Sequence, residues 1–314
     1  MKKNLFFIVI LFTFNGFSQL NVDSIGHVNY QVLHGTNLND IWGYTDEMDN
    51  EYALVGTEDG VGIVDISTPS APNEVFWSPG VNSTWRDLKT FGDYAYITNE
   101  FGGGLQIIDM SPLPSSAALT TTNYSGPIGQ EWTSAHNLYI DENGYCYIFG
   151  ANRGNKGVII LDVFTDPMNP TEVGVFDNWY VHDGYVANDT MYLGHILDGF
   201  LAIVDVVDKA NPIVLGTQLT PSTFTHNVWA SANGQYAFTT DEVSGGYLGA
   251  YDISDPANIF EVDRIQSSPD VGIIIPHNTH VKGNHIITSY YSDGVVIHDV
   301  TYPYNMIEVG NYDT

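Results

Sequence analysis

Short apolar runs that each end on an aspartate recur along the whole chain. Six of them read VGIVDIS, LQIIDMS, VIILDVF, LAIVDVV, LGAYDIS and VVIHDVT. Their aspartates follow one another at intervals of 43 to 53 residues and are Asp65, Asp109, Asp162, Asp205, Asp252 and Asp299. Self-similarity at a nearly fixed period of this length is typical of repeat architectures. The pattern therefore predicts six similar structural units.

Four strand-sized segments fit into each period between turn signals. The third repeat shows them most clearly, with apolar and β-branched segments at residues 137–140, 145–150, 158–163 and 171–176. An Asp-Glu-Asn-Gly turn separates the first two segments, and Asp-Pro and Asn-Pro pairs precede the fourth. The pattern predicts a four-stranded antiparallel blade in every repeat.

A ring of such blades explains the sequence better than a helical solenoid does. Helical repeats of similar period need long runs of good helix formers, and these are missing between the Gly, Pro and β-branched residues. Closure into a ring also protects the outer edges of the sheets. We therefore expect an all-β fold, a β-propeller of four-stranded antiparallel blades that occupies residues 19–314 as a single domain.

The first 18 residues have the layout of a secretory signal peptide. Lys2 and Lys3 precede an apolar run from residue 5 to 14, and the small residues Gly16 and Ser18 follow it. The run is too short to cross a bilayer, which takes roughly 20 residues. We expect cleavage after Ser18 and a mature chain without a transmembrane segment.

The aspartate-ending phrases resemble the LVIVD repeat. Together with the signal peptide, their arrangement is similar to that of the choice-of-anchor B family of secreted bacterial β-propellers. The resemblance covers nearly all of the mature chain. It implies a propeller fold and a secreted, extracellular or cell-surface location on a bacterium, and it brings no established activity.

Two different numbers of blades fit the sequence. Six repeats are visible, and an additional strand-like segment, Ile25 to Leu33, precedes the first of them. Many propellers close by placing an N-terminal strand on the outer edge of the last blade. The spare segment thus predicts seven blades, the last of them truncated because its inner strands would lie beyond Thr314. The alternative is a closed six-bladed ring, which pairing of Ile25–Leu33 with Val295–Val300 would favour.

The starts of the innermost strands align into the most informative column of the sequence. The column consists of six pairs of adjacent residues. The second residue of every pair carries a side-chain oxygen, and the first residue is histidine in four of the six pairs. The pairs are Asn39-Asp40, Arg86-Asp87, His136-Asn137, His182-Asp183, His226-Asn227 and His277-Asn278, and the sixth repeat adds His280. In a ring fold these positions converge on one central funnel.

The loops between the second and third strands of each blade open on the same face and bring further polar residues to the funnel. They supply Glu100, His195, Asp241 and Glu242. With them, the expected funnel-lining residues are Asp40, Asp87, His136, Asn137, Asp183, Asn227, Asn278, His280, Glu100, His195 and Glu242. Binding sites of propellers are commonly built in this way, on loops that a rigid scaffold holds.

Two interpretations of the column compete. In the first, Asp and Asn bind neighbouring backbone N–H groups and tie adjacent blades together, while His fills a half-buried polar niche. In the second, neutral imidazoles and carboxylates hold a divalent metal, for which Ca, Mn and Zn are candidates. The preferred metal ligands are His182, His226, His277 and Asp241.

The six repeat aspartates have a simpler interpretation. Each stands where a tight turn begins, and an Asp at such a position caps the turn by accepting a bond from the backbone N–H two residues later. The same chemistry makes Asp141 to Gly144 a hairpin tip. These residues are expected to be structural.

Charge and cysteine content exclude several classes of function. The chain has 9 Lys and Arg against 37 Asp and Glu, a formal charge of -28, which excludes a basic nucleic-acid-binding surface. Its single cysteine, Cys146, rules out an intrachain disulfide and is expected to be a small buried apolar residue.

Three functions remain. The first is an exported binding or interaction protein whose funnel or outer surface receives a saccharide, a peptide or a cell-surface partner. The second is a metal-dependent polysaccharide lyase or hydrolase that uses the funnel histidines. The third is a purely structural cell-surface module. The sequence favours the first.

Overall fold

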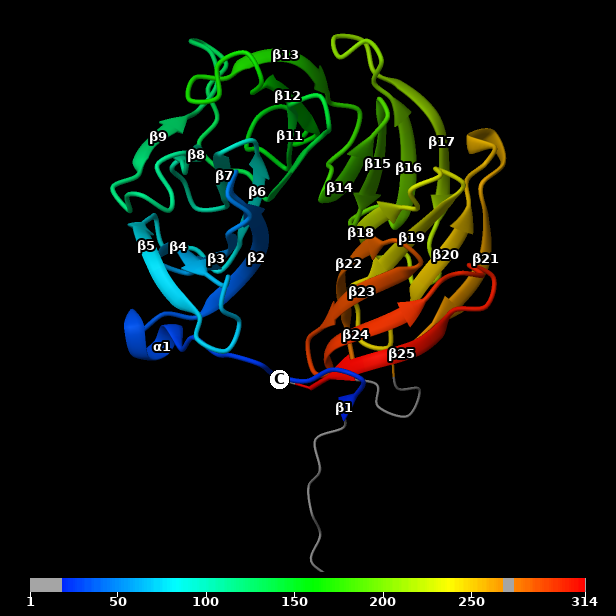
Figure 1. Cartoon of the computed structure of the whole chain (residues 1–314). Coiled ribbons are helices and arrows are strands. Elements are labelled where there is room, and N and C mark those ends of the chain that lie inside the picture. The colour runs from blue at the N-terminus through cyan, green and yellow to red at the C-terminus, as the bar shows by residue number, and fades with distance from the viewer. Residues whose placement is uncertain (1–18, 268–273, 314) are drawn as a thin grey trace, which may run out of the picture.

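The computed structural model describes residues 19–267 and 274–313. In these residues the strands form six separate antiparallel sheets arranged around a common axis (Figure 1). Each sheet contains four strands that follow one another in chain order, from the axis outwards, and the sixth sheet carries a fifth, N-terminal strand on its outer edge. The predicted β-propeller of four-stranded antiparallel blades is thereby confirmed.

The first three sheets span the N-terminal half of the chain. They consist of β2 (Leu38–Thr45), β3 (Glu51–Thr57), β4 (Gly60–Asp65) and β5 (Asn73–Pro79); β6 (Arg86–Phe91), β7 (Tyr94–Asn99), β8 (Leu105–Asp109) and β9 (Thr120–Tyr124); and β10 (Asn137–Ile140), β11 (Tyr145–Phe149), β12 (Val158–Asp162) and β13 (Thr171–Phe176).

The last three sheets continue the ring. They consist of β14 (Asp183–Ala187), β15 (Thr190–His195), β16 (Phe200–Asp205) and β17 (Ile213–Leu219); β18 (Thr225–Ala230), β19 (Tyr236–Asp241), β20 (Leu248–Asp252) and β21 (Phe260–Ile265); and β22 (Pro276–Lys282), β23 (His285–Tyr290), β24 (Gly294–Asp299) and β25 (Ile307–Tyr312). A short 3-10 helix, Pro256–Asn258, precedes β21.

The repeat aspartates close the turn after the third strand of every sheet. Each accepts a hydrogen bond from the backbone N–H two residues later, at 2.7–3.0 Å in all six cases. Asp141 caps its hairpin in the same way, accepting from the backbone N–H of Asn143 and Tyr145 at 2.9 Å each. The turn function predicted for these aspartates is confirmed.

The core lies between the faces of neighbouring sheets. One cluster, for example, joins Tyr96 and Ile107 of the second sheet to Leu138 and Ile148 of the third, and all four side chains are completely buried. Similar clusters join the other consecutive pairs from the first sheet to the sixth. Cys146 is buried in the first of these clusters, as predicted.

The segment Ile25 to Leu33 does not form the predicted strand. Its end folds into a short helix, α1 (Tyr30–Leu33), because Asn29 caps the helix by accepting from the N–H of Val32 at 3.0 Å. Tyr30 then packs against Val55 and Val64 on the face of the first sheet. The apolar residues of this segment cover a sheet face and do not extend an edge.

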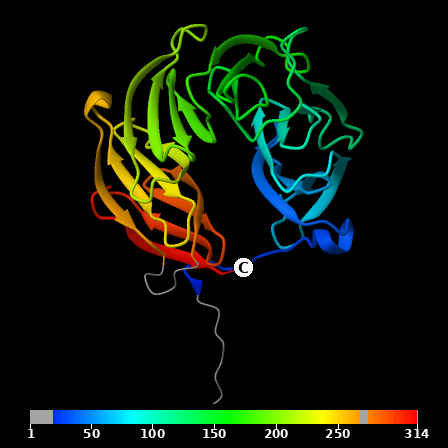
Figure 2. The same ribbon diagram turned by 180° about the vertical axis from the view of Figure 1, so that it is seen from behind.

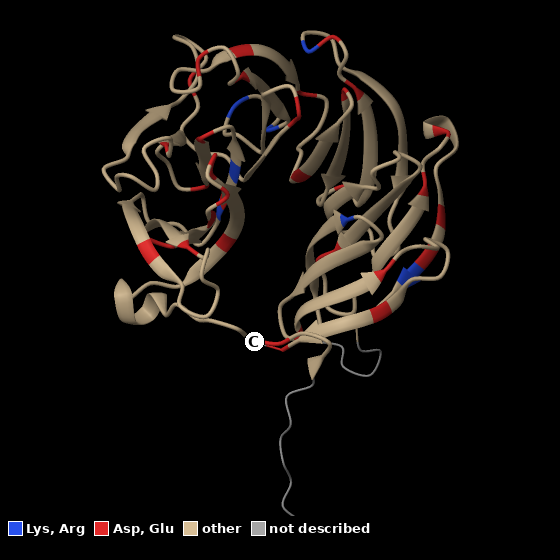
Figure 3. Cartoon of the chain, in the orientation of Figure 1, with Lys and Arg blue, Asp and Glu red and all other residues tan. Residues whose placement is uncertain are grey.

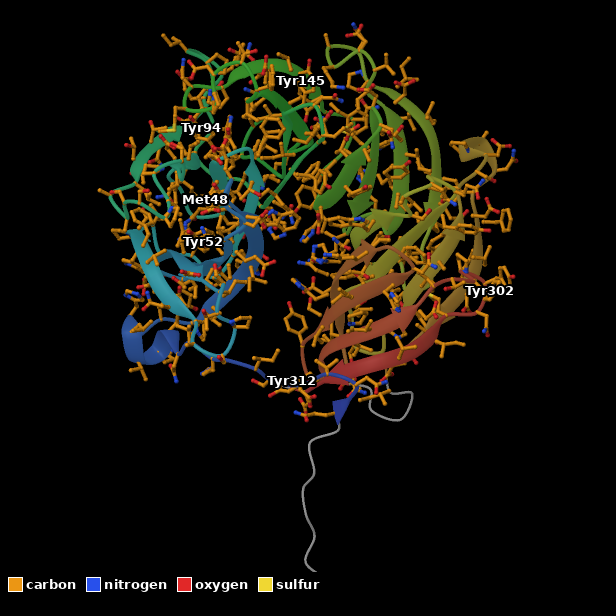
Figure 4. All side chains as sticks on the ribbon, in the orientation of Figure 1. Met48, Tyr52, Tyr94, Tyr145, Tyr302 and Tyr312 are labelled. Atoms are coloured by element: carbon orange, nitrogen blue, oxygen red, sulfur yellow. The ribbon has the colours of Figure 1, made fainter. Side chains whose placement is uncertain are left out.

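A different N-terminal strand lies on the outer edge of the last sheet. β1 (Gln19–Leu20) pairs antiparallel with β25, with Gln19 opposite Tyr312 and Leu20 opposite Asn311. Figure 4 labels Tyr312 at this junction. The expected edge pairing is therefore present, but it uses residues that precede the predicted segment.

The described residues contain six blades. The inner strands of consecutive sheets pack on one another, whereas β2 and β22 are much less closely packed, and the ribbons of the first and sixth sheets flank an opening in both views (Figures 1 and 2). The rings of Trp42 and His280 still approach across this boundary, with centroids 6.1 Å apart. A seventh blade beyond Thr314 remains a prediction.

The predicted signal peptide lies outside the described residues. Within them, no helix is long and apolar enough to cross a membrane.

Neighbouring blades are tied together at the start of their inner strands. A carboxylate oxygen of Asp40 in the first sheet accepts from the backbone N–H of Leu88 in the second, at 2.9 Å. Asn227 in the fifth sheet accepts from the N–H of Thr279 in the sixth at 3.1 Å. Its amide donates to Asp183 in the fourth sheet at 2.8 Å. These bonds confirm the structural interpretation for three second members of the column.

The bond between Asp40 and Leu88 gives a stability prediction. The Asp40→Leu variant removes the acceptor and leaves a poorly hydrated N–H, which should lower the free energy of unfolding by about 1–3 kcal/mol. Asp40→Asn keeps a carbonyl oxygen and should lose less than half as much. Urea denaturation measures both, and the exposed Asp59→Leu is the control, expected to change stability by less than about 0.5 kcal/mol. Equal stability of the Asp40→Leu and Asp40→Asn variants would contradict the proposed role of this bond.

Candidate functional site

Four histidines from four consecutive blades meet at the axis. His136 and His182 stand directly before β10 and β14, and His226 and His277 lie in β18 and β22. Their ring centroids are 3.9, 4.4 and 4.3 Å apart from one neighbour to the next. We call His136, His182, His226 and His277 the histidine cluster. The aligned column of the sequence is thus brought together in space.

The cluster contains two overlapping sets of possible metal ligands. One is His136, His182 and His226, and the other is His226, Glu242 and His277. Within each set, the possible ligand atoms all lie within 4.8 Å of one another. Both sets include His226, which makes it the central member of the cluster.

Two carboxylates flank the histidine cluster. Nδ1 of His136 lies 2.5 Å from Oε1 of Glu100, so a proton on Nδ1 leaves the lone pair of Nε2 free for another partner. Glu242 lies 3.5 Å from Nε2 of His226 and 3.7 Å from Nε2 of His277. The hydroxyl of Tyr291 donates to Glu242 at 2.5 Å. The carboxylates therefore orient the imidazoles on both sides of the cluster.

Burial keeps His182, His226 and His277 neutral. It lowers the pKa of His182 and of His226 well below the ordinary value, and the neighbouring histidines lower both further. Burial likewise lowers the pKa of His277 to about 4. Nδ1 of His182 and Nδ1 of His226 are buried without a hydrogen-bond partner. Neutral imidazoles held together in this way have the protonation state that a metal ligand requires.

Asp241 does not join the cluster, although the sequence analysis preferred it as a ligand. Its carboxylate accepts from the Thr220 hydroxyl at 2.5 Å and from the backbone N–H of Ser222 at 2.7 Å, and it holds the loop before β18. The next residue, Glu242, faces the histidines instead. Successive side chains of an extended chain point in opposite directions, so a shift of one position exchanges the two roles.

The other predicted funnel residues fall into two groups. Around the opening lie Asp40, Asp87, Asn137 and Asn278, together with His136, His226 and His277. His195 lies apart from the cluster, completely buried against Phe200, with Nδ1 2.8 Å from the carbonyl oxygen of Tyr180. His280 lies among Trp42 and Trp229.

A buried acidic layer surrounds a lysine that the sequence analysis did not single out. Nζ of Lys89 lies 2.6 Å from Asp87 and 4.6 Å from the ring centre of Trp42. Burial raises the pKa of Asp183 to about 6 and also raises the pKa of Asp40 and of Asp87. Lys89 follows Asp87 by two residues on the same strand, so the two side chains point to the same side. This spacing in the sequence could have indicated the pair.

Aromatic residues fill the axis at the next level. They stand three positions after the first member of the column in four of the sheets. The ring of Tyr185 stacks on Trp229 at 4.5 Å, and Tyr139 meets both of them edge-on at 5.0 and 5.5 Å. Trp229 in turn contacts His280 at 4.6 Å. Trp42, Lys89, Tyr139, Tyr185, Trp229 and His280 form what we call the axial layer.

The open space at the funnel is small. It measures about 40 Å³ and is lined by residues of the column and by Trp85. By the same measure a cavity needs about 10–15 Å³ to hold one water molecule, so the space suits one ion with about two water molecules and is too small for a sugar ring. A larger ligand would have to lie on the rim.

Comparison with known families identifies the repeat. A model of the LVIVD repeat matches residues 48–77, 84–122 and 225–266, so the chain contains LVIVD repeats. No curated protein matches the sequence.

Solved structures share the fold at low identity. The periplasmic gluconolactonase of Pseudomonas aeruginosa is 11% identical with a TM-score of 0.64, over 88% of this chain and 83% of that chain. A functionally unknown protein from Desulfotomaculum acetoxidans has the same identity and TM-score over 92% and 90%. The Swd1 β-propeller domain of Myceliophthora thermophila reaches 0.56 at 11% identity over 88% and 90%. Identities this low show the fold alone.

The axial layer gives a prediction on pH. Burial, and then the charge of Lys89, lower the pKa of His280 to about 4, against about 6.5 in an unfolded chain. Between these values the unfolded chain binds a proton that the folded protein does not, so the contribution of His280 to stability falls as the pH falls from about 6.5 towards 4. Replacing His280 by Phe should make stability less sensitive to acid in this window.

NMR titration of the His280 ring in metal-free protein and urea denaturation at pH 7 and 5 test this prediction. The His298→Phe variant should reduce the acid sensitivity in the same way, since His298 lies in β24 and its pKa is also lowered to about 4 by burial. A His280 resonance that titrates near pH 6.5 in the folded protein would contradict the prediction.

Proposed function

We propose that this chain is an exported β-propeller binding protein whose histidine cluster holds a divalent transition metal. One observation carries the proposal: four imidazoles from four different blades, two of them buried and two partly buried, contact one another in series, and two nitrogens of the buried pair have no hydrogen-bond partner. A buried polar atom without a partner costs about 1–3 kcal/mol, and a bound cation would remove that cost.

The donor set favours a transition metal over calcium. Each ligand set contains at least two imidazoles, and at most one carboxylate. Calcium takes six to eight oxygen ligands, whereas zinc binds three or four imidazole and carboxylate groups at about 2.0–2.2 Å. Zinc is therefore the first candidate and manganese the second. His226 would be a ligand in either set, with His182 or His277 beside it.

The rim favours a role in binding. Trp85, Phe101 and Tyr291 are 47%, 65% and 59% exposed. Trp85 lines the funnel, Phe101 follows Glu100, and Tyr291 contacts Glu242, so all three lie near the histidine cluster. Acidic residues are distributed over all six sheets, while basic residues are few (Figure 3). A saccharide, a peptide or a cell-surface partner without strong negative charge would suit this rim.

A second candidate is a metal-dependent lyase or hydrolase. The Tyr291 hydroxyl donates to Glu242, and the Tyr291 ring lies 5.3 Å from the ring of His277, so a group able to transfer a proton stands beside the candidate ligands. A structural surface module is the third candidate. The gluconolactonase among the structural neighbours contributes no activity to this proposal, because its likeness extends only to the fold.

Export rests on the signal peptide predicted for residues 1–18. β1 begins at Gln19, so cleavage after Ser18 would leave every described strand intact. The choice-of-anchor B resemblance supports the same location.

Metal analysis tests the proposal. Protein incubated with zinc and dialysed should retain about one ion per chain by mass spectrometry of the metal. His226→Gln should weaken zinc binding at least tenfold, because His226 belongs to both ligand sets. His298→Gln replaces a completely buried histidine outside the cluster and should retain the ion.

Three outcomes separate the candidate functions. Zinc that is retained equally by wild type and His226→Gln would overturn the proposed site. Loss of stability in His226→Gln, with no metal bound by either protein, would favour the structural module. Tyr291→Phe should keep the ion, and loss of a saccharide-cleaving activity in this variant alone would favour the enzyme.

A further inference from the structure

Arg86 stands where four other blades carry histidine, and its charge has no partner. The residue is 5% exposed. Its guanidinium donates to three backbone carbonyls, those of Thr57 at 3.0 Å, Val81 at 2.8 Å and Glu58 at 3.5 Å. In the part of the chain that the structure describes, no carboxylate lies within 4.0 Å of it.

An unpaired buried cation is unexpected in this protein. Acidic residues outnumber basic residues 37 to 9, so a counter-ion would be easy to supply. Burying a charge without an opposite charge is costly, because the group loses its hydration. Burial lowers the pKa of Arg86 to about 10, and the charge of Asp59, which forms no ion pair with it, offsets this cost only in part. An anion from solution would offset it.

A pocket opens beside Arg86, separate from the histidine cluster. It measures about 230 Å³ and lies between the segment Pro79–Val81 and the second sheet. Arg86, Asn99, Gln106 and Asn123 supply its polar side chains, and glycines 102–104 form part of its wall. Its volume is below the 300–1,000 Å³ typical for drug-sized ligands, so it suits a molecule about the size of a monosaccharide.

Three glycines form one wall of the pocket. All three have a positive φ, which side chains rarely adopt, at 142°, 92° and 68°. A Cβ atom at Gly103 would lie 3.7 Å from Val81 and from Asn123, which both line the pocket, so a side chain there would take up part of its space.

The amide side chains of the wall are oriented by the protein. Gln106 donates its Nε2 to the Ser78 hydroxyl at 2.8 Å, and Asn123 donates its Nδ2 to the Gly103 carbonyl at 2.6 Å. Each amide nitrogen keeps a second N–H, and neither carbonyl oxygen accepts a hydrogen bond from the residues that the structure describes, so both amides can accept from hydroxyl groups. The wall thus offers one cation and two fixed acceptors.

From the buried Arg86 and this polar pocket, we propose a second ligand site, specific for a small hydroxylated monocarboxylate. The carboxylate binds the guanidinium, and the hydroxyl groups donate to Gln106 and Asn123. A single negative charge matches the one unpaired cation. A doubly charged phosphate is disfavoured by Asp59, which precedes the same segment and accepts from Asn82 at 2.7 Å.

Calorimetric titration with D-gluconate and with L-lactate tests the site, with sorbitol as the neutral analogue of gluconate. At least one acid should bind saturably, and sorbitol should not. Nε and Nη2 of Arg86 are bonded to backbone carbonyls, so Nη1 is the nitrogen left for the carboxylate. Arg86→Lys should weaken binding at least tenfold, because lysine has one nitrogen and cannot bind the carbonyls and the ligand in this arrangement, and Arg86→Gln should abolish it. Arg153→Gln is the matched control, since Arg153 is already paired with Glu172 at 2.8 and 2.9 Å.

Two further measurements keep the test independent of folding and of the metal. Side-chain amide resonances of Gln106 and Asn123 in wild type should shift on titration, and this requires no variant. Binding should also persist after chelation and in His226→Gln. Failure of both acids to bind folded wild type, tighter binding of inorganic phosphate, full binding by folded Arg86→Gln, or loss of binding on chelation would each overturn the proposal.

Discussion

The hydrogen bonds that cross from one blade to the next at the axis determine the rest of the structure. A side-chain oxygen of Asp40 or Asn227 accepts from the backbone of the neighbouring inner strand, one residue after the equivalent position of that strand. Each bond fixes how far one inner strand is shifted along the axis relative to the next. Because the shift is fixed, equivalent side chains of successive blades lie at the same level, and residues far apart in the sequence become neighbours.

This arrangement gives adjacent residues of one dipeptide different roles. In the fourth and fifth blades, Asp183 and Asn227 bind each other, while His182 and His226, one position earlier, lie in contact above them. Alternation along an extended strand separates the two kinds of side chain. One residue of each pair therefore makes the hydrogen bonds that connect the blades, and the other is free to bind a ligand.

Much of the fold could be predicted from the sequence, because its determinants are local and repeated. The turn-capping aspartates and the four strands per period each depend on residues close in the chain. The ring arrangement of the blades was enough to predict that the histidines converge. It was not enough to predict which way a side chain points within a loop, and for that reason Asp241 was preferred over Glu242. The segment from Ile25 to Leu33 was misassigned because its apolar residues pack on a sheet face, and only the cap at Asn29 signals the helix. Arg86 was part of the aligned column, but its lack of an ion pair is a property of the assembled molecule and could not be predicted. Lys89 was missed although its alternation with Asp87 along the strand indicates its position.

The aromatic filling of the axis has a consequence for kinetics. Tyr139, Tyr185 and Trp229 pack together one level further along the axis, so aromatic rings of three blades lie at the inner end of the funnel. An ion held by the histidines that leaves at the outer end would pass Glu242 and Tyr291. A molecule bound over Glu242 and Tyr291 would lengthen the residence time of the ion without touching it. The rate at which the ion exchanges with solution would therefore report whether the outer surface is occupied.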